Sequence, residues 1–169
     1  MRLLTRILFF FYLILISQPS IAKFSTPIEI NQQLQERGVN SVVAEINEKY
    51  EQDDIIHHIS TGDPQWLQIA FDLLPNIHTE FSKKIVEALS VALTENPVAV
   101  LALVKAHRIL SITDICHLPP TLQGRSQKEA LFRKMMNSLN AAEKSSSEKN
   151  RENIEICRWE LEKVSDLYL

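Results

Sequence analysis

The sequence predicts an all-α fold, and three observations support this prediction. Only three of the 169 residues are glycine, whereas a β-sheet protein needs glycine at many tight turns. Apolar residues recur at helical spacing in several segments. Asp63-Pro64 and Asn96-Pro97 each combine a side chain that caps a helix with a proline suited to the first helical position. We expect seven or eight helices of about 8 to 18 residues, packed as an irregular bundle or a short stack of helical hairpins.

Residues 1–22 have the pattern of a signal peptide. Arg2 and Arg6 lead into an uncharged apolar run, Ile7–Ile16, which is shorter than the roughly 20 residues needed to span a bilayer. Small residues, including Ala22, follow the run, so we expect cleavage after Ala22. An uncleaved membrane anchor is the alternative, and it is disfavoured because the apolar run is short. The sequence therefore predicts a periplasmic or secreted protein without a stable membrane anchor.

Cleavage would leave residues 23–169 as a single helical domain, which is long enough for a hydrophobic core. It would also remove two arginines and no acid, so that the formal net charge changes from −3 to −5. Binding to a phosphate backbone needs several clustered cations, and the sequence contains no such cluster. We therefore expect no nucleic-acid partner.

Three short helices are expected in the N-terminal part of this domain. Thr26 and Glu29 have the spacing of a capping box, and Gly38 is placed to end the first helix. A second helix is expected from about Asn40, and a short third helix should end at Gly62. The apolar residues expected on their buried faces are Val39, Val42, Val43, Ile46 and Tyr50 in the second helix, and Ile55, Ile56 and Ile59 in the third.

The helices that follow Asp63 and Asn96 are strongly apolar. The second of them is apolar from Val98 to Val104, as a buried strand would also be, but the proline cap and the alanines favour a helix. The two caps lie 33 residues apart, which suggests a repeat, although the flanking sequences do not match. The polar stripe expected on the first of these helices is Gln65, Gln68 and Asp72.

Three amphipathic helices complete the predicted domain. In the first of them Glu80 and Lys84 lie four residues apart on the solvent side. The other two follow Pro119-Pro120 and are joined by a serine-rich loop, Lys144–Lys149. Their apolar faces are Phe81, Ile85, Ala88, Leu89, Ala92 and Leu93 in the first, Leu131, Phe132, Met135, Met136 and Leu139 in the second, and Ile154, Cys157, Leu161, Val164 and Tyr168 in the third.

The two cysteines are the most specific signal in the chain. Cys157 lies on the apolar face of the last helix and Cys116 follows an apolar segment, so both are expected to face the interior. In an exported protein such a pair forms a disulfide most simply. Two free buried thiols are the alternative. A redox-active or metal-bound pair is disfavoured, because catalytic dithiols usually have a Cys-x-x-Cys spacing.

No metal, cofactor or catalytic residue is predicted. His57 and His58 are adjacent, and neighbouring residues on a helix point about 100° apart, so the two cannot chelate one ion. His117 and Cys116 are also adjacent, so the same argument disfavours a metal site at these two residues. Nucleophile elbows, phosphate-binding loops and dinucleotide-binding glycine motifs are missing from the sequence. Three large apolar residues are interpreted as core rather than as a ligand-binding patch: Trp66, Met135 and Met136.

Two motifs at a fixed separation, Gly-Asp-Pro-x-Trp-Leu at Gly62–Leu67 and Asn-Pro-x-Ala-Val-Leu at Asn96–Leu101, precede Cys116. This part of the chain, with the later Cys157, resembles a family of exported all-helical proteins from proteobacteria that has no assigned activity. The resemblance covers roughly residues 39–116 and implies a periplasmic helical domain with a disulfide. The chain departs from the family in lacking a glycine after Cys116.

By elimination, we expect a small periplasmic module that binds another protein, as antibacterial immunity proteins of similar size do. The first alternative is a cell-envelope hydrolase with a site assembled between helices, and the second is a structural helical-repeat scaffold. Converging Asp, Glu or His side chains in a pocket would favour the hydrolase. An exposed apolar surface would favour the binding module.

Overall fold

The structure is a computed structural model that describes residues 26–46, 49–76 and 79–168. Over these residues the chain forms nine α-helices, one short 3-10 helix (η1) and no strand, so the all-α prediction is confirmed. The predicted signal peptide, residues 1–22, lies outside the described residues. The elements are α2 (Pro27–Arg37), α3 (Val39–Glu45), α4 (Lys49–Ser60), α5 (Pro64–Leu73), η1 (Leu74–Asn76), α6 (Thr79–Ala92), α7 (Pro97–His107), α8 (Ile112–Ile115), α9 (Arg125–Ser145) and α10 (Glu148–Tyr168).

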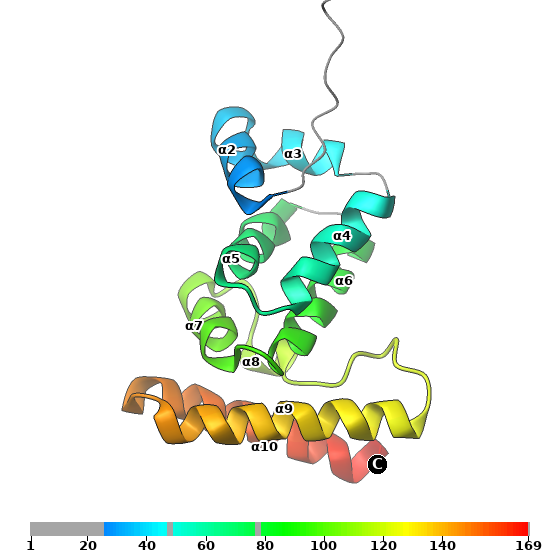
Figure 1. Ribbon diagram of the computed structural model, residues 1–169, viewed down its shortest axis with the longest axis vertical. Coiled ribbons are helices and arrows are strands. Elements are labelled where there is room, and N and C mark those ends of the chain that lie inside the picture. Colours follow the sequence, from blue (N-terminus) through cyan, green and yellow to red (C-terminus); the bar gives the residue numbers. More distant parts are fainter. Residues whose placement is uncertain (1–25, 47–48, 77–78, 169) are drawn as a thin grey trace, which may run out of the picture.

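The helices are stacked along the longest axis of the molecule (Figure 1). α2 and α3 lie at one end, α4 to α8 form the middle, and the long hairpin of α9 and α10 closes the other end. In the middle, α4 packs against α6 and α5 against α7, so two successive helical hairpins lie side by side. The number of helices exceeds the expected seven or eight. α8 has only four residues, which is too short for apolar periodicity to reveal it.

The start and end of α2 are as predicted. The Glu29 backbone N–H donates to Thr26 Oγ1 over 3.3 Å, and the Thr26 N–H donates to Glu29 Oε2 over 3.1 Å, which completes the capping box. Gly38 ends the helix at a φ of 78°, in the region that favours glycine.

The prediction that one helix carries both Ile46 and Tyr50 is wrong. α3 ends at Glu45, because Ile46 leaves the helical conformation with a ψ of 29°, and Lys49 begins α4. The Gln52 side chain then donates to the carbonyl oxygen of Ile46 over 3.1 Å. Three residues expected to face the core lie where the structure describes no side chains: Tyr50, Val164 and Tyr168.

The two Asx-Pro caps are confirmed, and a hydrogen bond joins the second cap to the turn that precedes the first. Asp63 Oδ1 accepts from the N–H groups of Gln65 (2.9 Å) and Trp66 (3.2 Å) at the start of α5. Asn96 Oδ1 accepts from Ala99 N–H over 3.2 Å at the start of α7. The Asn96 side chain also donates from Nδ2 to the carbonyl oxygen of Gly62 over 3.1 Å. One side chain therefore caps α7 and joins the turn of the α6–α7 hairpin to the turn of the α4–α5 hairpin.

The core runs through all of these layers, and α5 lies at its centre. Trp66 and Met135 are buried as predicted, with 6 % and 0 % of their surface exposed, while Met136 is half-buried. None of the described helices is long and apolar enough to cross a membrane. The largest fully buried side chains are Phe71, Ile30, Ile46, Ile55, Ile59, Leu67, Ile69, Leu73, Ile85, Leu89, Leu93 and Leu101.

The predicted loop Lys144–Lys149 is wrong, because helix replaces most of it. α9 continues to Ser145, whose hydroxyl donates to the carbonyl oxygen of Ala142 over 3.2 Å, back into the last turn of its own helix. α10 begins at Glu148, so the serine-rich connection is only two residues long. The ion pair between Arg158 and Glu143, at 2.5 Å, holds the two long helices together.

Candidate functional site

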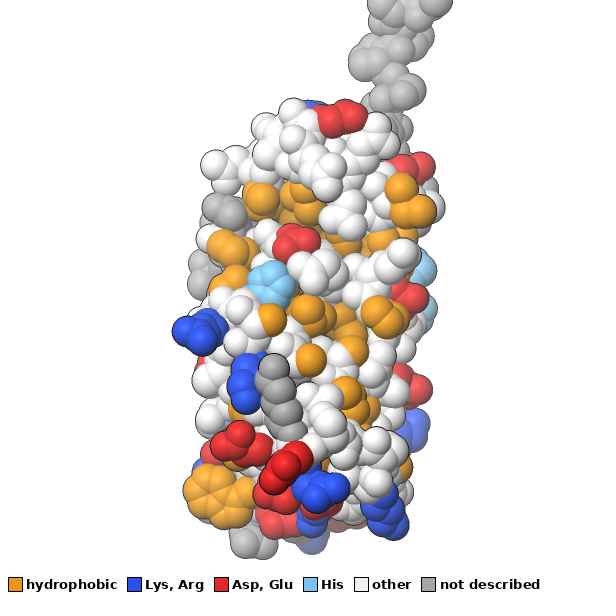
Figure 2. All heavy atoms as spheres, turned by 90° about the vertical axis from the view of Figure 1, so that its left-hand side faces the viewer, with side chains coloured by type: hydrophobic (Ala, Val, Ile, Leu, Met, Phe, Trp, Pro, Cys, Tyr) orange, Lys and Arg blue, Asp and Glu red, His pale blue; other side chains and the backbone are white. Residues whose placement is uncertain are grey.

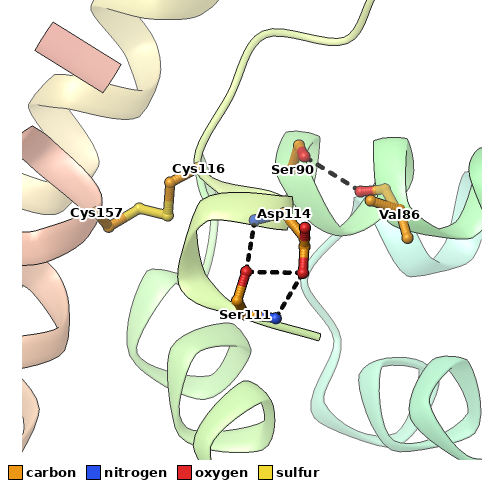
Figure 3. Close-up of a disulfide and its surroundings, with 6 residues drawn as sticks. All are labelled: Val86, Ser90, Ser111, Asp114, Cys116 and Cys157. Carbon is orange, nitrogen blue, oxygen red and sulfur yellow. Dashed lines mark hydrogen bonds between the residues drawn. A yellow bond between two sulfur atoms is a disulfide. The ribbon is translucent and has the colours of Figure 1, made fainter. Parts of the chain in front are cut away.

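The disulfide predicted between Cys116 and Cys157 is formed (Figure 3). The two Cα atoms lie 5.2 Å apart, and both cysteines are buried. Cys116 ends α8, and Cys157 lies on the buried face of α10. The bond therefore ties the segment after α8 to the middle of the last helix, and its burial indicates a structural role.

A capping box holds α8 in place beside this bond (Figure 3). The carboxylate of Asp114 accepts hydrogen bonds from the backbone N–H and the hydroxyl of Ser111, both over 2.7 Å. Both bonds favour the charged carboxylate and so lower the pKa of Asp114 below its ordinary value of 3.8. The bond from the backbone N–H contributes more to this shift than the bond from the hydroxyl. A carboxylate with a lowered pKa stabilises the fold above its ordinary pKa and loses this contribution as the pH falls through the lowered value.

Replacing Asp114 by Asn should therefore change the acid sensitivity of the protein. At pH 7 we expect Asp114→Asn to lower the free energy of unfolding by about 0.5 to 1 kcal/mol, a small effect because the side chain is exposed. Below the lowered pKa the difference from the wild type should disappear, because Asp114 is then uncharged. Urea denaturation at pH 7 and at successively lower pH measures this difference, and a constant difference would contradict the interpretation.

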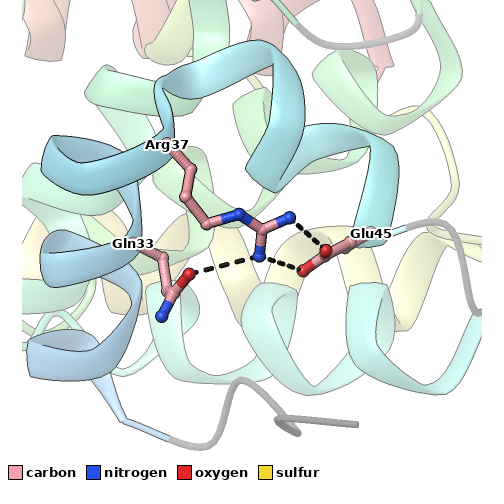
Figure 4. Close-up of polar contacts among 3 residues, drawn as sticks. All are labelled: Gln33, Arg37 and Glu45. Carbon is pink, nitrogen blue, oxygen red and sulfur yellow. Dashed lines mark hydrogen bonds and ion pairs between the residues drawn. The ribbon is translucent and has the colours of Figure 1, made fainter. Parts of the chain in front are cut away.

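A second polar cluster joins α2 to α3 (Figure 4). Arg37 binds both carboxylate oxygens of Glu45, with Nη1 2.9 Å from Oε2, and also donates to Gln33 Oε1 over 3.2 Å. The hydrogen bond from Arg37 is the main cause that lowers the pKa of Glu45, and the same bond raises the pKa of Arg37. The cluster spans the turn at Gly38, so we assign it to the α2–α3 connection and not to a binding site.

The histidines singled out in the sequence do not form a metal site. His58 stacks on Trp66 with ring centroids 4.6 Å apart, and the neighbouring His57 is exposed. His117 contacts the carbonyl oxygen of Leu118 through Nδ1 over 3.0 Å. Within residues 26–46, 49–76 and 79–168, no three His, Cys, Asp or Glu side chains are arranged to hold a metal ion.

A groove of about 390 Å³ lies between α2, α5 and the end of α7, and we call it the α2–α7 groove. Figure 2 shows the side of the molecule on which these helices lie, with hydrophobic side chains gathered in its upper and middle parts and charged ones toward the α9–α10 end. Ile109, which follows α7, is 43 % exposed, whereas most large apolar side chains that the structure describes are buried or half-buried. The groove is lined by Asn31, Leu34, Gln35, Val39, Phe71, Asp72, Pro75, His107 and Ile109.

Two residues that line the groove, Asp72 and His107, are joined by the side chain of Gln68 in a polar cluster. Gln68 Nε2 lies 3.0 Å from Asp72 Oδ1 and 3.2 Å from His107 Nε2, so its two hydrogens serve both acceptors. With Nε2 of His107 as an acceptor, a neutral imidazole carries its proton on Nδ1. The ring also stacks on Phe71, with centroids 5.1 Å apart. Packing and hydrogen bonding therefore fix the orientation of His107 at the groove.

The sequence predicted that two residues of this cluster share a helical face, but not that His107 contacts them. Gln68 and Asp72 belong to the predicted polar stripe of α5, and their spacing of four residues places them on one face. His107 comes from α7, 39 residues after Gln68, and no local pattern connects it to that stripe. Because the family resemblance implies no activity, it could not supply the missing residue either.

Comparisons with protein-family models, with curated proteins and with solved structures found no match for this chain.

Proposed function

We propose that this protein is an exported binding module that holds an extended segment of another protein in the α2–α7 groove. The observation that supports the proposal is the pair of amide side chains of Asn31 and Gln35, which line the groove together with apolar side chains. Among the residues that the structure describes, neither side-chain amide has a hydrogen-bond partner. Both are thus available to bind a peptide backbone.

The spacing of the two amides suits an extended chain. Asn31 and Gln35 are four residues apart on α2, which corresponds to a rise of about 6 Å along the helix. In an extended chain, backbone groups that point to the same side recur every second residue, at about 6.6 Å. A segment lying along α2 can therefore pair with both amides, each of which offers a donor and an acceptor.

The groove also has room for an apolar side chain of this segment. Four apolar side chains line it: Phe71, which is buried, Leu34, and the exposed Pro75 and Ile109. A volume of about 390 Å³ is at the lower end of the range for ligand sites, and it suits an anchor side chain rather than a large cofactor. Main-chain pairing with a side-chain pocket is a common way to recognise peptides.

The hydrolase alternative has weaker support. Asp72 and His107 both line the groove, but the amide of Gln68 binds both of them, so Asp72 does not orient the imidazole directly as the carboxylate of a catalytic triad does. The repeat-scaffold alternative draws on the two adjacent hairpins, α4–α5 and α6–α7, but accounts for neither the free amides nor the exposed Ile109.

Ile109→Asp tests the groove, and Ile156→Asp is its matched control. Both side chains are large, apolar and about equally exposed, at 43 % and 40 %, but Ile156 lies on α10, outside the groove. Peptides selected from a random displayed library against the purified protein should bind the wild type and the Ile156→Asp variant. They should lose at least about tenfold in affinity for Ile109→Asp, which corresponds to about 1.4 kcal/mol. Selection of no peptide, or equal losses in both variants, would contradict the proposal.

Export is part of the same proposal. The buried disulfide fits a protein that folds outside the reducing cytoplasm. The basic start and the short apolar run before Ala22 support the finer expectation of a cleaved signal peptide and a periplasmic or secreted protein. N-terminal sequencing of the protein from cells should start at Lys23 or within a few residues of it. Recovery of an intact Met1 in the membrane fraction would contradict this prediction.

A further inference from the structure

A second hollow, of about 620 Å³, lies on the other side of the end of α7, where this helix packs against the first turns of α10. We call it the α7–α10 cleft. On α7, Ala102 and Ala106 leave space because their side chains are small, and Lys105 lies on the same helical face. Arg108, Asn150 and Asn153 complete its lining.

The cleft carries positive charge in a protein of formal net charge −3. Lys105 and Arg108 are exposed, and neither forms an ion pair within the described part of the chain. The acidic residues of the first turns of α10, Glu148 and Glu152, lie about 100° or more around the helix from both asparagines. Two free cations therefore face the cleft without an acidic neighbour on that face of α10.

Asn153 is the second observation that points to a ligand. Its surface is 94 % buried, because only 6 % is exposed, yet its side-chain amide has no hydrogen-bond partner among the described residues. Among the described residues only Arg158 Nε is a fully enclosed side-chain polar atom without a partner, so the Asn153 amide remains accessible from the cleft that it lines. An unpaired amide at this place suits a bound polar group. Asn150, one helical turn earlier, also has an amide without a partner in the described part of the chain.

The backbone at Arg108 supports the same interpretation. Arg108 has a φ of 56° and a ψ of 21°, and it ends α7 in the left-handed conformation. Glycine is the usual residue at such a position, because a side chain there adds strain. Outside glycine, no other described residue has a positive φ. An arginine at this position places a guanidinium at the mouth of the cleft at a conformational cost.

We propose that the α7–α10 cleft binds a small organic anion. Carboxylate or phosphate oxygens of the ligand pair with Lys105 and Arg108, and the amides of Asn150 and Asn153 bind its uncharged polar atoms. Charge-assisted hydrogen bonds of this kind are the strong ones in binding sites, and a guanidinium can hold either oxyanion through two parallel bonds. This site goes beyond the proposed peptide groove, shares no lining residue with it and is tested separately.

A purely structural role makes a different prediction. Cations near the end of a helix interact favourably with its carbonyl groups, so Lys105 and Arg108 would on that basis serve only to stabilise α7. Arg108→Gly separates the two roles, because glycine relieves the backbone strain while it removes the guanidinium. Asn153→Leu does so independently, because it replaces the unpaired amide with an apolar side chain of similar size and breaks no hydrogen bond within the described part of the chain.

The experiment is a calorimetric titration of protein purified from cells that express the full chain, at low ionic strength. The probes are inorganic phosphate, glycerol phosphate and succinate. Comparison of their affinities distinguishes phosphate ligands from carboxylate ligands. We expect saturable binding of at least one probe with a Kd of about 1 mM or tighter. Arg108→Gly and Asn153→Leu should each weaken this binding by about tenfold, while their melting temperatures stay equal to that of the wild type or rise.

Lys83→Ala is the charge-matched control, because it removes a cation from α6, away from the cleft, and it should leave binding unchanged. Three results would overturn the proposal: no saturable binding of any probe, equal weakening by Lys83→Ala, or a lower melting temperature of Arg108→Gly with unchanged affinity. The last of these would assign Arg108 to the end of the helix alone.

Discussion

Serine in place of Cys116, of Cys157 or of both should lower the free energy of unfolding by the same amount, about 4 kcal/mol. The bond closes a loop across a sequence separation of 41 residues, and its loss restores the conformational freedom of that loop in the unfolded chain. The double replacement should cost no more than either single one, because all three variants remove one and the same link.

Urea denaturation of the three variants, with the wild type in the presence and absence of a thiol reductant, measures this effect. The reduced wild type should unfold like the double variant, which separates the loss of the bond from the effect of serine itself. Thiol titration of the unfolded, unreduced wild type is the independent check. Two free thiols per chain would show that the bond does not form, and the cysteines would then act only as buried apolar side chains.

Gly62→Ala should lower the free energy of unfolding by about 3 kcal/mol, for two separate reasons. Gly62 has a φ of 73°, which L-residues with a Cβ rarely adopt. A Cβ built there would also lie 3.0 Å from Cβ of Glu95 and 3.1 Å from Cβ of Asn96, and neither atom belongs to the flexible end of a side chain. The substitution therefore strains the turn and pushes the two helical hairpins apart.

Two further variants divide this effect. Gly124 has a φ of 102°, but a Cβ there would meet no atom within 4 Å, so Gly124→Ala should cost only the backbone strain, about 1 to 2 kcal/mol. Asn96→Asp keeps an oxygen to cap α7 but replaces the donor to the Gly62 carbonyl with a second acceptor, so its cost reports the lost bond between the turns together with the repulsion of the two oxygens. Equal losses in Gly62→Ala and Gly124→Ala would show that the close contact contributes nothing.

Local signals in the sequence predicted most of the helices. Caps at Thr26, Asp63 and Asn96 are readable because each cap bonds within its own first turn. The errors arose where a helix boundary depends on other parts of the chain or on a few hydrogen bonds. The end of α3 at Glu45 interrupts an apolar spacing that continues to Tyr50, and α9 includes Lys144 and Ser145 before it ends at its C-cap, Ser146.

The grooves could not be predicted in the same way, because their residues come from helices that are far apart in the sequence. His107 reaches Gln68 across 39 residues, and Lys105 faces Asn150 across 45. The disulfide was the exception, because a chain with two cysteines allows only one intramolecular pairing. Free amides such as those of Asn31 and Asn153 become recognisable only when the burial and partners of each side chain are known.

The bond from Asn96 to Gly62 also limits how the length of this protein can change. Because Asn96 contacts Gly62, the segment between the two turns, which includes α5 and α6, must bring the chain back to this contact. Insertion of one residue within α6 would rotate the rest of that helix by about 100° and turn its buried face toward solvent. The segment from Pro120 to Gly124 is mostly exposed, and it is hydrogen-bonded to α6 through the side chain of Thr121, which donates to Glu87 over 2.6 Å. Homologues of this chain should therefore vary in length after α8 while keeping the 33-residue interval between the two caps.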